Sequence, residues 1–355
     1  MSPATMWACR VFAYGDPSVL KMVEVPLPTP GPDEVLLQVR ATAVARHDVT
    51  RRRGELTGLN GQPFPLPFQP GQNAAGVVVS LGERVRDIAL GDHAATMSAP
   101  ACGNCWYCRR GEDAFCVNQE RPSRNTQGTY ADYMTCRASE LLVAPKHIPF
   151  AKLANCVWPY STAWNMAVHH AEIEPGFSVL VTGASGSIGL AAMQIARLRG
   201  ASQIIAVSNS RDKAPRLLEL GADAVIDGRG DDVPQAARGL TSGRGVDLVL
   251  DCVGGDLFVA GLRALRNCGR LVNIAQLGGE QVSFNLRELF PRGISIHGTR
   301  GSTRAAQEDV LRLLADGRID PVIHAVLPLS QAADGHRIFE AQAHVGRIIL
   351  TPEHA

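Results

Sequence analysis

The fold class is decided by one stretch near the middle of the chain, Val179-Leu180-Val181-Thr182-Gly183-Ala184-Ser185-Gly186-Ser187-Ile188-Gly189. An apolar strand is followed here by a glycine-rich turn and by a helix that Gly200 ends. One face of this helix carries Ile188, Ala192, Ile195 and Leu198. In such a setting the backbone N–H groups and the helix dipole can hold a pyrophosphate, and glycines allow the tight turn. The stretch therefore predicts a nucleotide-binding βαβ unit.

Two different patterns lie on either side of this unit. From about residue 175 onward, apolar strands alternate with helices, and further strands are predicted at 203–207, 224–226, 246–250 and 270–274. This alternation predicts a parallel sheet that helices cover on both faces. The first ~150 residues instead read as short strands broken by Gly and Pro. With 355 residues, the chain is long enough for two domains.

Composition and charge narrow the expected partners and location. The hydrophobic content is 45%, the charged content is 19% and the net charge is +1, so nothing favours nucleic acid or an anionic membrane as partner. A small-molecule substrate is expected instead. The first residues lack a basic segment followed by an apolar one, and no run approaches ~18 apolar residues, which predicts a cytoplasmic protein.

Four of the nine cysteines, Cys102, Cys105, Cys108 and Cys116, lie within fifteen positions of one another. This spacing on a short loop is typical of a tetrahedral zinc site, and two disulfides or free thiols are the alternative. Because all four ligands would come from the protein, no position would remain for water or substrate. The expected zinc is therefore structural, one per chain.

Several motifs agree in their order along the chain. They are the opening Val11–Gly15, the four-cysteine lobe, Gly128-Thr129-Tyr130-Ala131-Asp132-Tyr133, the glycine-rich turn, and the closing Gly346–Leu350. In these motifs the chain resembles the medium-chain dehydrogenase/reductase superfamily. The resemblance implies an α/β protein with a discontinuous GroES-like catalytic domain, residues 1–153 and 295–355, whose zinc lobe spans 100–118. It also implies a doubly wound Rossmann NADP(H)-binding domain over 154–294, and a homodimer.

The chain departs from the zinc-dependent members of that superfamily. Their catalytic ligands would fall at three places that here carry Ala45, Gln72 and Trp158, and none of these is a preferred zinc ligand. Asp48, followed by Arg52 or Arg53 and Gly54, resembles the quinone oxidoreductase-like and enone reductase branch. That branch transfers hydride directly from the nicotinamide to an electrophilic carbon, without a catalytic metal.

The resemblance places three candidate donors for the developing enolate around the nicotinamide: His47, Tyr160 and Gln72. An imidazole such as that of His47 can transfer protons near neutral pH, although a histidine satisfied by a backbone carbonyl is an equal alternative. Asp48 is expected to orient neighbouring loop groups rather than to react.

The preference for NADP(H) or NAD(H) depends on the end of the second predicted strand, which reads Ser208-Asn209-Ser210-Arg211-Asp212-Lys213. An NAD-specific protein would offer a carboxylate here, whereas Arg211 with Ser208 or Ser210 can bind a 2′-phosphate. NADPH is therefore the predicted cofactor; the alternative is that Arg211 and Lys213 are merely solvated. The resemblance adds as cofactor-binding residues Thr162, Val253, Asn273, Ile274, Ala275, Thr299 and Arg300.

The leading hypothesis is an NADPH-dependent oxidoreductase, an enzyme that reduces an enone, quinone or similar activated alkene. A zinc-independent carbonyl or alcohol oxidoreductase is the first alternative. An NADPH-binding protein with little turnover is the second, because fold does not fix function.

Overall fold

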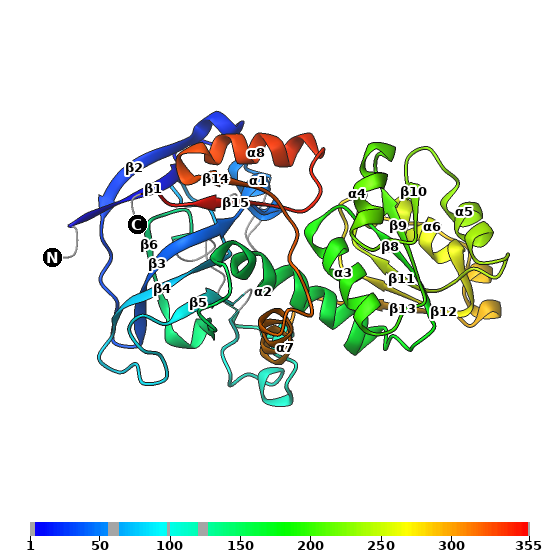
Figure 1. The fold of residues 1–355 in the computed structure, drawn as a ribbon, viewed down its shortest axis with the longest axis horizontal. Helices are drawn as coiled ribbons and strands as arrows, with labels where there is room; N and C mark the ends of the chain where they lie inside the picture. Colours follow the sequence, from blue (N-terminus) through cyan, green and yellow to red (C-terminus); the bar gives the residue numbers. More distant parts are fainter. Residues whose placement is uncertain (1–3, 56–63, 98–99, 120–126, 354–355) are drawn as a thin grey trace. The chain divides into compact units, whose positions relative to one another are not determined.

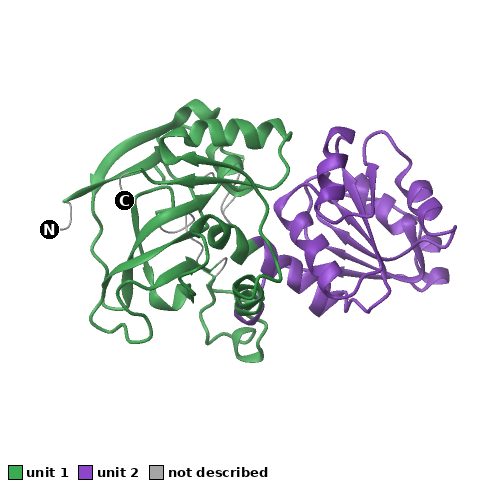
Figure 2. Cartoon of the chain, in the orientation of Figure 1, with its two compact units in different colours: residues 1–158, 307–355 green, residues 159–306 purple. Residues whose placement is uncertain are grey.

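The computed structural model describes residues 4–55, 64–97, 100–119 and 127–353, which form two compact units. The first unit joins Met1–Trp158 to Gln307–Ala355, and the second is Pro159–Ala306 (Figures 1 and 2). Helix α2 (Phe150–Trp164) and helix α7 (Arg304–Ala315) each contain a unit boundary. No helix in the described residues has the length and apolar character needed to cross a membrane.

The first unit is built on a seven-stranded sheet in which both ends of the chain take part. Its strands are β3 (Glu34–Ala43), β4 (Ala74–Leu81), β5 (His93–Thr96), β6 (Tyr133–Arg137), β7 (Leu141–Ala144), β14 (Ile323–Pro328) and β15 (Arg347–Thr351). The strand order is β14-β15-β3-β4-β5-β7, and β6 pairs with β3. The closing strand β15 runs antiparallel to β3, with Ile349 opposite Ala43, which makes this unit discontinuous in sequence.

Alternate side chains of β3 lie on the same face of the sheet and form part of its hydrophobic core. Val35, Leu37 and Val39 lie two residues apart, so they share one face and pack on Val78 and Met134. The unit also contains a separate antiparallel pair, β1 (Thr5–Val11) and β2 (Leu20–Pro26), and the helices α1 (Arg46–Arg52) and α8 (Ala332–Ala341).

The second unit contains a parallel sheet of six strands in the order β10-β9-β8-β11-β12-β13. The strands are β8 (Ser178–Thr182), β9 (Gln203–Ser208), β10 (Ala224–Asp227), β11 (Val246–Asp251), β12 (Leu265–Asn273) and β13 (Ser295–Gly298). The helices are α3 (Ser187–Leu198), α4 (Ala214–Glu219), α5 (Val233–Leu240) and α6 (Asp256–Ala264). The direction in which successive strands are added to the sheet reverses between β8 and β11. Ligands of doubly wound sheets bind beside such a point, at the carboxyl ends of the strands. The predicted α/β class is confirmed.

One predicted boundary differs from the observed arrangement. The sequence predicts residues 295–355 in the first domain, yet β13 pairs in parallel with β12, with Ser295 opposite Arg270. The strand therefore belongs to the sheet of the second unit, and the chain returns to the first unit after it. The pairing that decides this lies between distant segments, so local periodicity could not reveal it.

Candidate functional site

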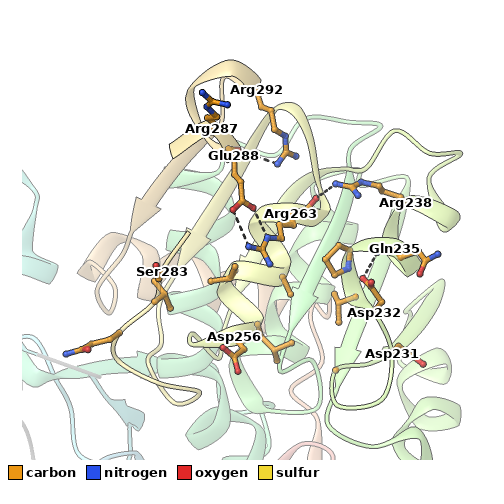
Figure 3. Close-up of a pocket in the computed structure, with 18 residues that line it drawn as sticks. Asp231, Asp232, Gln235, Arg238, Asp256, Arg263, Ser283, Arg287, Glu288 and Arg292 are labelled. Carbon is orange, nitrogen blue, oxygen red and sulfur yellow. Dashed lines mark hydrogen bonds and ion pairs between the residues drawn. The ribbon is translucent and has the colours of Figure 1, made fainter. Parts of the chain in front are cut away.

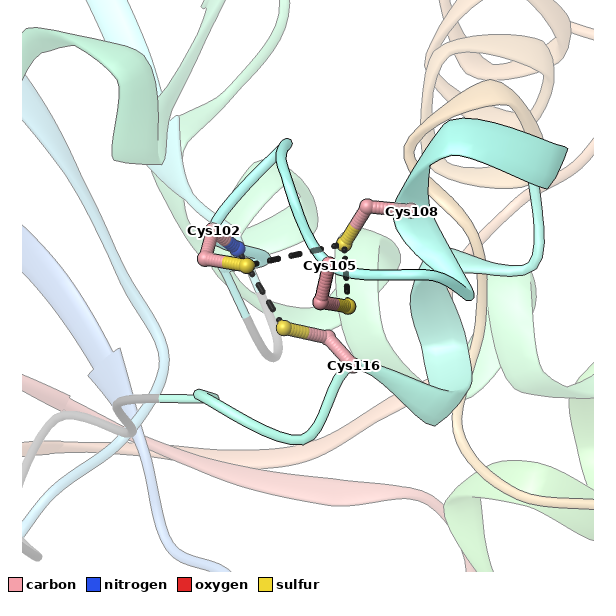
Figure 4. A group of neighbouring side chains, drawn as sticks. All are labelled: Cys102, Cys105, Cys108 and Cys116. Atoms are coloured by element: carbon pink, nitrogen blue, oxygen red, sulfur yellow. Dashed lines mark hydrogen bonds between the residues drawn. The ribbon is translucent and has the colours of Figure 1, made fainter.

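The four predicted zinc ligands lie together in the first unit. The sulfur atoms of Cys102, Cys105, Cys108 and Cys116 all fall within 4.8 Å of one another (Figure 4). Cys105 and Cys108 are 3.4 Å apart at sulfur, and Cys102 and Cys108 are 4.0 Å apart, so no disulfide links them. Tetrahedral zinc with Zn–S bonds of about 2.3 Å separates its ligands by roughly 3.8 Å. The donor set therefore fits one zinc ion.

The electrostatics of this lobe favour a cation. A hydrogen bond from the backbone N–H of Asn104 lowers the pKa of the Cys102 thiol to about 6. Burial, followed by hydrogen bonding to Cys105, raises the pKa of the neighbouring Cys108 thiol to about 12. Without a metal, one thiol is thus favoured as the thiolate while its neighbour is held protonated. A dication bound by all four sulfur atoms would remove this conflict.

Asp48 connects two segments that carry candidate catalytic residues. Its carboxylate accepts hydrogen bonds from the backbone N–H groups of Ala45 and Gly71, and both N···O distances are 2.9 Å. The first bond holds the start of α1, where His47 lies, and the second holds the loop that contains Gln72. Burial raises the pKa of Asp48 to about 6, although these N–H groups and the nearby Arg347 and Arg51 oppose the shift. Asp48 therefore has the contacts of an orienting residue.

Gly71 is required for the geometry of this loop. Its φ is +99°, and a Cβ atom would lie 2.3 Å from Oγ1 of Thr129. The following residues, Gln72 and Asn73, are buried at 1% and 2% exposure. Asn73 accepts a hydrogen bond from Arg347 over 3.1 Å at its side-chain oxygen, and the backbone oxygen of Gln72 accepts one from Thr96 over 3.4 Å.

Helix α2 supplies the remaining candidates. Tyr160 and Thr162 are buried at 1% exposure each, and Oγ1 of Thr162 has no hydrogen-bond partner among the described residues. Cys156, on the same helix, donates its thiol to the backbone oxygen of Val310 over 3.8 Å, and burial raises the pKa of that thiol well above its usual value. Its contacts are those of a core residue.

In the second unit, the glycine-rich turn joins β8 to α3 as predicted. Gly183 has a φ of +61°, and a Cβ atom on Gly189 would lie 2.4 Å from the backbone oxygen of Gly183. Glycine at these positions therefore permits the turn and the close approach of helix and strand. The N-cap residue of α3 is Gly186, which offers no side-chain oxygen to the N–H groups of the first turn. These groups suit an anion.

The structure separates the two cations that follow β9. Arg211 forms an ion pair with Asp231 over 2.6 Å, lies 3.6 Å from Asp227, and is 73% exposed. Lys213 is buried and donates to Ser185 over 3.2 Å and to the side-chain oxygen of Asn209 over 2.8 Å. Burial, followed by repulsion from Arg229, lowers the pKa of Lys213. Lys213, rather than Arg211, is the cation that contacts the glycine-rich turn.

Two serines near Lys213 differ in their contacts. Ser208 is 2% exposed, and its Oγ has no hydrogen-bond partner in the described part of the chain. Ser210 instead caps the short helix that follows, accepting from the N–H of Asp212 over 3.2 Å. Ser208 is thus an unsatisfied buried hydroxyl at the carboxyl end of β9.

Asp251, at the end of β11, organises a second group of predicted cofactor residues. Its carboxylate accepts from Thr182 over 2.6 Å, from Asn273 over 2.7 Å and from the N–H groups of Val253 and Gly254. The side chain of Asn273 also donates to the backbone oxygen of Ala275 over 2.8 Å. The segments 252–254 and 273–275 are therefore held together. This role of Asp251 is not among the predicted ones; its signal in the sequence is a carboxylate that directly follows Leu248-Val249-Leu250 at the end of a strand.

The predicted residues of the 299–300 segment lie at the carboxyl end of β13. The backbone N–H of Thr299 donates to the backbone oxygen of Asn273 over 2.9 Å, and its hydroxyl accepts from Asn165 over 3.2 Å. Arg300 directly follows. Asn165 is a further residue that the sequence analysis did not single out.

Comparisons with known proteins match most of the chain. A family model described as zinc-binding dehydrogenase matches residues 187–316, and one described as alcohol dehydrogenase GroES-like domain matches residues 31–146. Acryloyl-coenzyme A reductase of Sulfurisphaera tokodaii is 30% identical over 336 residues, which cover 94% of this chain and 96% of that protein.

Two solved structures have the same fold. One, an NAD-dependent alcohol dehydrogenase, has a TM-score of 0.90 and 34% identity, and the match covers 98% of this chain and 99% of that one. The other, a zinc-binding dehydrogenase of Sinorhizobium meliloti 1021 bound to NADP, has a TM-score of 0.87 and 27% identity over 99% of this chain and 100% of that one. The predicted pairing of a GroES-like domain with a Rossmann domain is confirmed.

Proposed function

The chain belongs to the medium-chain dehydrogenase/reductase superfamily, and from this membership we propose that it is an NADPH-dependent reductase of an enone, quinone or similar activated alkene. The observation that carries the proposal is the replacement of all three catalytic-zinc positions by Ala45, Gln72 and Trp158. In a conjugated acceptor the charge that hydride transfer creates develops on an enolate oxygen, which protein donors can stabilise without a metal. The similarity to acryloyl-coenzyme A reductase supports this reaction class.

The bound nicotinamide would supply the hydride, and the protein would position the acceptor and stabilise its charge. His47 is the proposed donor to the enolate oxygen, with Gln72 and Tyr160 as the rival donors. Asp48 would act as a positioning residue, because it fixes the segments of both His47 and Gln72 through backbone N–H groups. Such preorganised positioning accounts for a large share of enzymatic rate enhancement.

We propose NADPH rather than NADH on the contacts at the end of β9. The unsatisfied hydroxyl of Ser208 and the buried ammonium of Lys213 offer a donor and a charge for a 2′-phosphate. No carboxylate ends this strand to repel that phosphate or to bind a ribose hydroxyl. Arg211 would assist only after leaving Asp231, so its share is expected to be smaller.

The four-cysteine lobe would hold one structural zinc. Because its four sulfur atoms complete a tetrahedral set, the zinc would fold the loop and leave no open position for substrate. Zinc at this lobe would therefore contribute to stability and not to hydride transfer.

A zinc-independent carbonyl or alcohol oxidoreductase is the second candidate, because the match to an NAD-dependent alcohol dehydrogenase has 34% identity. One experiment separates the candidates. NADPH oxidation is followed at 340 nm with a panel of enones, quinones, an acryloyl thioester, unconjugated aldehydes and ketones. Preference for conjugated acceptors supports the proposal, whereas preference for unconjugated carbonyls favours the second candidate. Tight NADPH binding without turnover on any acceptor would indicate a binding protein.

A cytoplasmic homodimer is also proposed. Apolar side chains that precede the edge strand β13 are exposed, among them Leu286 at 67% and Phe290 at 73%. Such a patch beside an unpaired edge favours association. All nine cysteines lack a disulfide, which suits a reducing compartment. Light scattering coupled to size exclusion tests the dimer, and a monomeric mass would reject it.

A further inference from the structure

Four arginines gather at the amino-terminal edge of the parallel sheet in the second unit. Arg238 lies in the last turn of α5, Arg244 precedes β11, Arg266 is the second residue of β12, and Arg292 precedes β13. Because β8, β11, β12 and β13 are parallel, their first residues share one edge. The glycine-rich turn follows the end of β8, at the opposite edge. These four residues, here called the arginine basin, are therefore separate from the proposed cofactor site.

The arginine basin lines an open surface cavity. Its volume is about 280 Å³, and besides the four arginines only Leu265 and Asn267 line it among the described residues. Arg238 and Arg292 also line an adjoining cavity of about 1030 Å³, whose walls Figure 3 shows. That larger cavity carries carboxylates, including Asp232, Asp256 and Glu288, and apolar groups such as Val233 and Leu257. The two cavities share Arg238 and Arg292, and the larger one is also lined by Arg263 and Arg287.

Within the described residues, the basin holds more positive than negative charge. Arg244 and Arg266 share a single carboxylate, that of Asp247. Arg238 donates to the backbone oxygen of Arg263 over 2.7 Å, and Arg292 donates to that of Leu262 over 3.3 Å. These oxygens belong to the last turn of α6, which carries about half a negative charge. Four guanidinium groups therefore face the carboxylate of Asp247 and about half a charge at the helix end, and Glu288, which also acts on Arg292, already pairs with Arg263.

Helix capping alone does not explain this arrangement. One cation near the carboxyl end of a helix stabilises it by about 0.3–1 kcal/mol and is enough to balance the helix dipole. Two arginines donate to the last carbonyl groups of α6, and two more line the same cavity. Burial, followed by repulsion from Arg238, lowers the pKa of Arg292, so the cations already act against one another. An anion in the cavity would relieve that repulsion.

We propose that the arginine basin binds a small molecule that carries two or more phosphate groups. A pyrophosphate or a pair of phosphates matches the surplus positive charge, and guanidinium groups bind phosphate oxygens through paired hydrogen bonds. A single carboxylate would leave most of the surplus uncompensated. The lining of the larger cavity includes four carboxylates, whereas no carboxylate lines the basin among the described residues, so the phosphates would occupy the basin. This site is independent of the proposed reductase activity.

Isothermal titration of the full chain with inorganic pyrophosphate tests the proposal. The cofactor site also suits phosphate, so wild type is compared with Lys213→Met and with the double variant Arg238→Gln/Arg244→Gln. We expect the double variant to lose at least tenfold in affinity while Lys213→Met retains this binding event. Arg216→Gln is the matched control, because Arg216 is an exposed arginine of the same unit paired with Glu219. Thermal unfolding checks folding, and Arg244→Gln alone replaces the double variant if the latter is unstable.

Four results would overturn the proposal. No heat of binding with wild type would reject the site outright. Loss of all binding in Lys213→Met, with the double variant unaffected, would assign pyrophosphate to the cofactor site. Equal affinity for sulfate at the same ionic strength would indicate unspecific charge screening. A poly-glutamate peptide that binds the basin more tightly than pyrophosphate would indicate an acidic protein segment as the occupant.

Discussion

Arg52 donates its Nε–H to Nδ1 of His336 over 3.2 Å, and both side chains are fully buried in the first unit. A guanidinium group only donates, so Nδ1 must accept and the proton of the neutral imidazole resides on Nε2, 3.2 Å from the hydroxyl of Tyr130. Arg52 also pairs with Glu340. This network ties α1 and the Gly128–Tyr133 motif to α8, close to the end of the chain.

The network predicts acid sensitivity. Burial, followed by the charge of Arg52, lowers the pKa of His336 to about 3. Between that value and the ordinary pKa of about 6.5, the unfolded chain binds the proton and the folded one does not. The contribution of His336 to the free energy of unfolding is therefore lost as pH falls below about 6.5, by about 1.4 kcal/mol per pH unit.

The measurement is denaturant unfolding of wild type and His336→Asn from pH 7 to pH 4. The variant should show a shallower loss of stability over this range, because its site no longer titrates. His324→Asn, at an exposed histidine, is the control. Equal pH dependence of wild type and His336→Asn would contradict the prediction.

The contribution of Asp48 to the free energy of unfolding changes with pH in the opposite direction to that of His336. The pKa of Asp48 is raised to about 6, so between about 3.8 and 6 the folded protein binds the proton and the unfolded chain does not. Its contribution to stability is present at low pH and is lost as pH rises through this window. In Asp48→Asn the loss of stability on acidification should therefore become steeper than in wild type.

The same variant should lower kcat about tenfold or more, since one of the two N–H groups loses its acceptor, with the apparent KM for NADPH nearly unchanged. An unaltered kcat would remove Asp48 from the positioning role.

Local features of this chain were readable from the sequence, and long-range partners were not. The turn at 183–189 and the spacing of Cys102 to Cys116 are contiguous, so their residue types alone indicate the strand–turn–helix unit and the sulfur cluster. The ion pair between Arg211 and Asp231 spans twenty positions and depends on how the loop after β10 returns toward β9. The raised pKa of Asp48 likewise depends on burial, which residue types do not give. Site geometry therefore required the folded chain even where the candidate residues could be named.

One zinc per chain is expected from elemental analysis, because among the described residues only the four cysteines form a group with a complete ligand set. Cys105→Ser should lose the metal and lower the melting temperature, while protein that remains folded keeps measurable turnover. Cys156→Ser, at a core cysteine outside the lobe, should keep the metal. Two zinc ions per chain would contradict the metal-free reaction proposed above.

NADPH should be preferred over NADH, and Lys213 should carry more of that preference than Arg211. Lys213→Met should raise the apparent KM for NADPH roughly ten- to a hundredfold, since a charge-assisted hydrogen bond contributes on the order of 1.5–3 kcal/mol. Arg211→Gln should have a smaller effect, because its guanidinium already pairs with Asp231. Initial rates with both nucleotides measure this, with NADH as the internal control. A larger effect of Arg211→Gln would restore Arg211 as the main phosphate ligand.

The donor to the enolate oxygen is tested by a pair of variants. If His47 supplies that hydrogen bond or proton, His47→Ala should depress kcat by ~10²-fold or more, with NADPH binding nearly intact, as expected for a general acid. Tyr160 is fully buried, and Tyr160→Phe keeps its ring while removing only the hydroxyl, so it tests the rival donor without opening a cavity. A near-native rate in His47→Ala beside a crippled Tyr160→Phe would transfer the role to tyrosine. Near-native rates in both would mean that solvent protonates the product, so that the protein contributes only the alignment of hydride and acceptor.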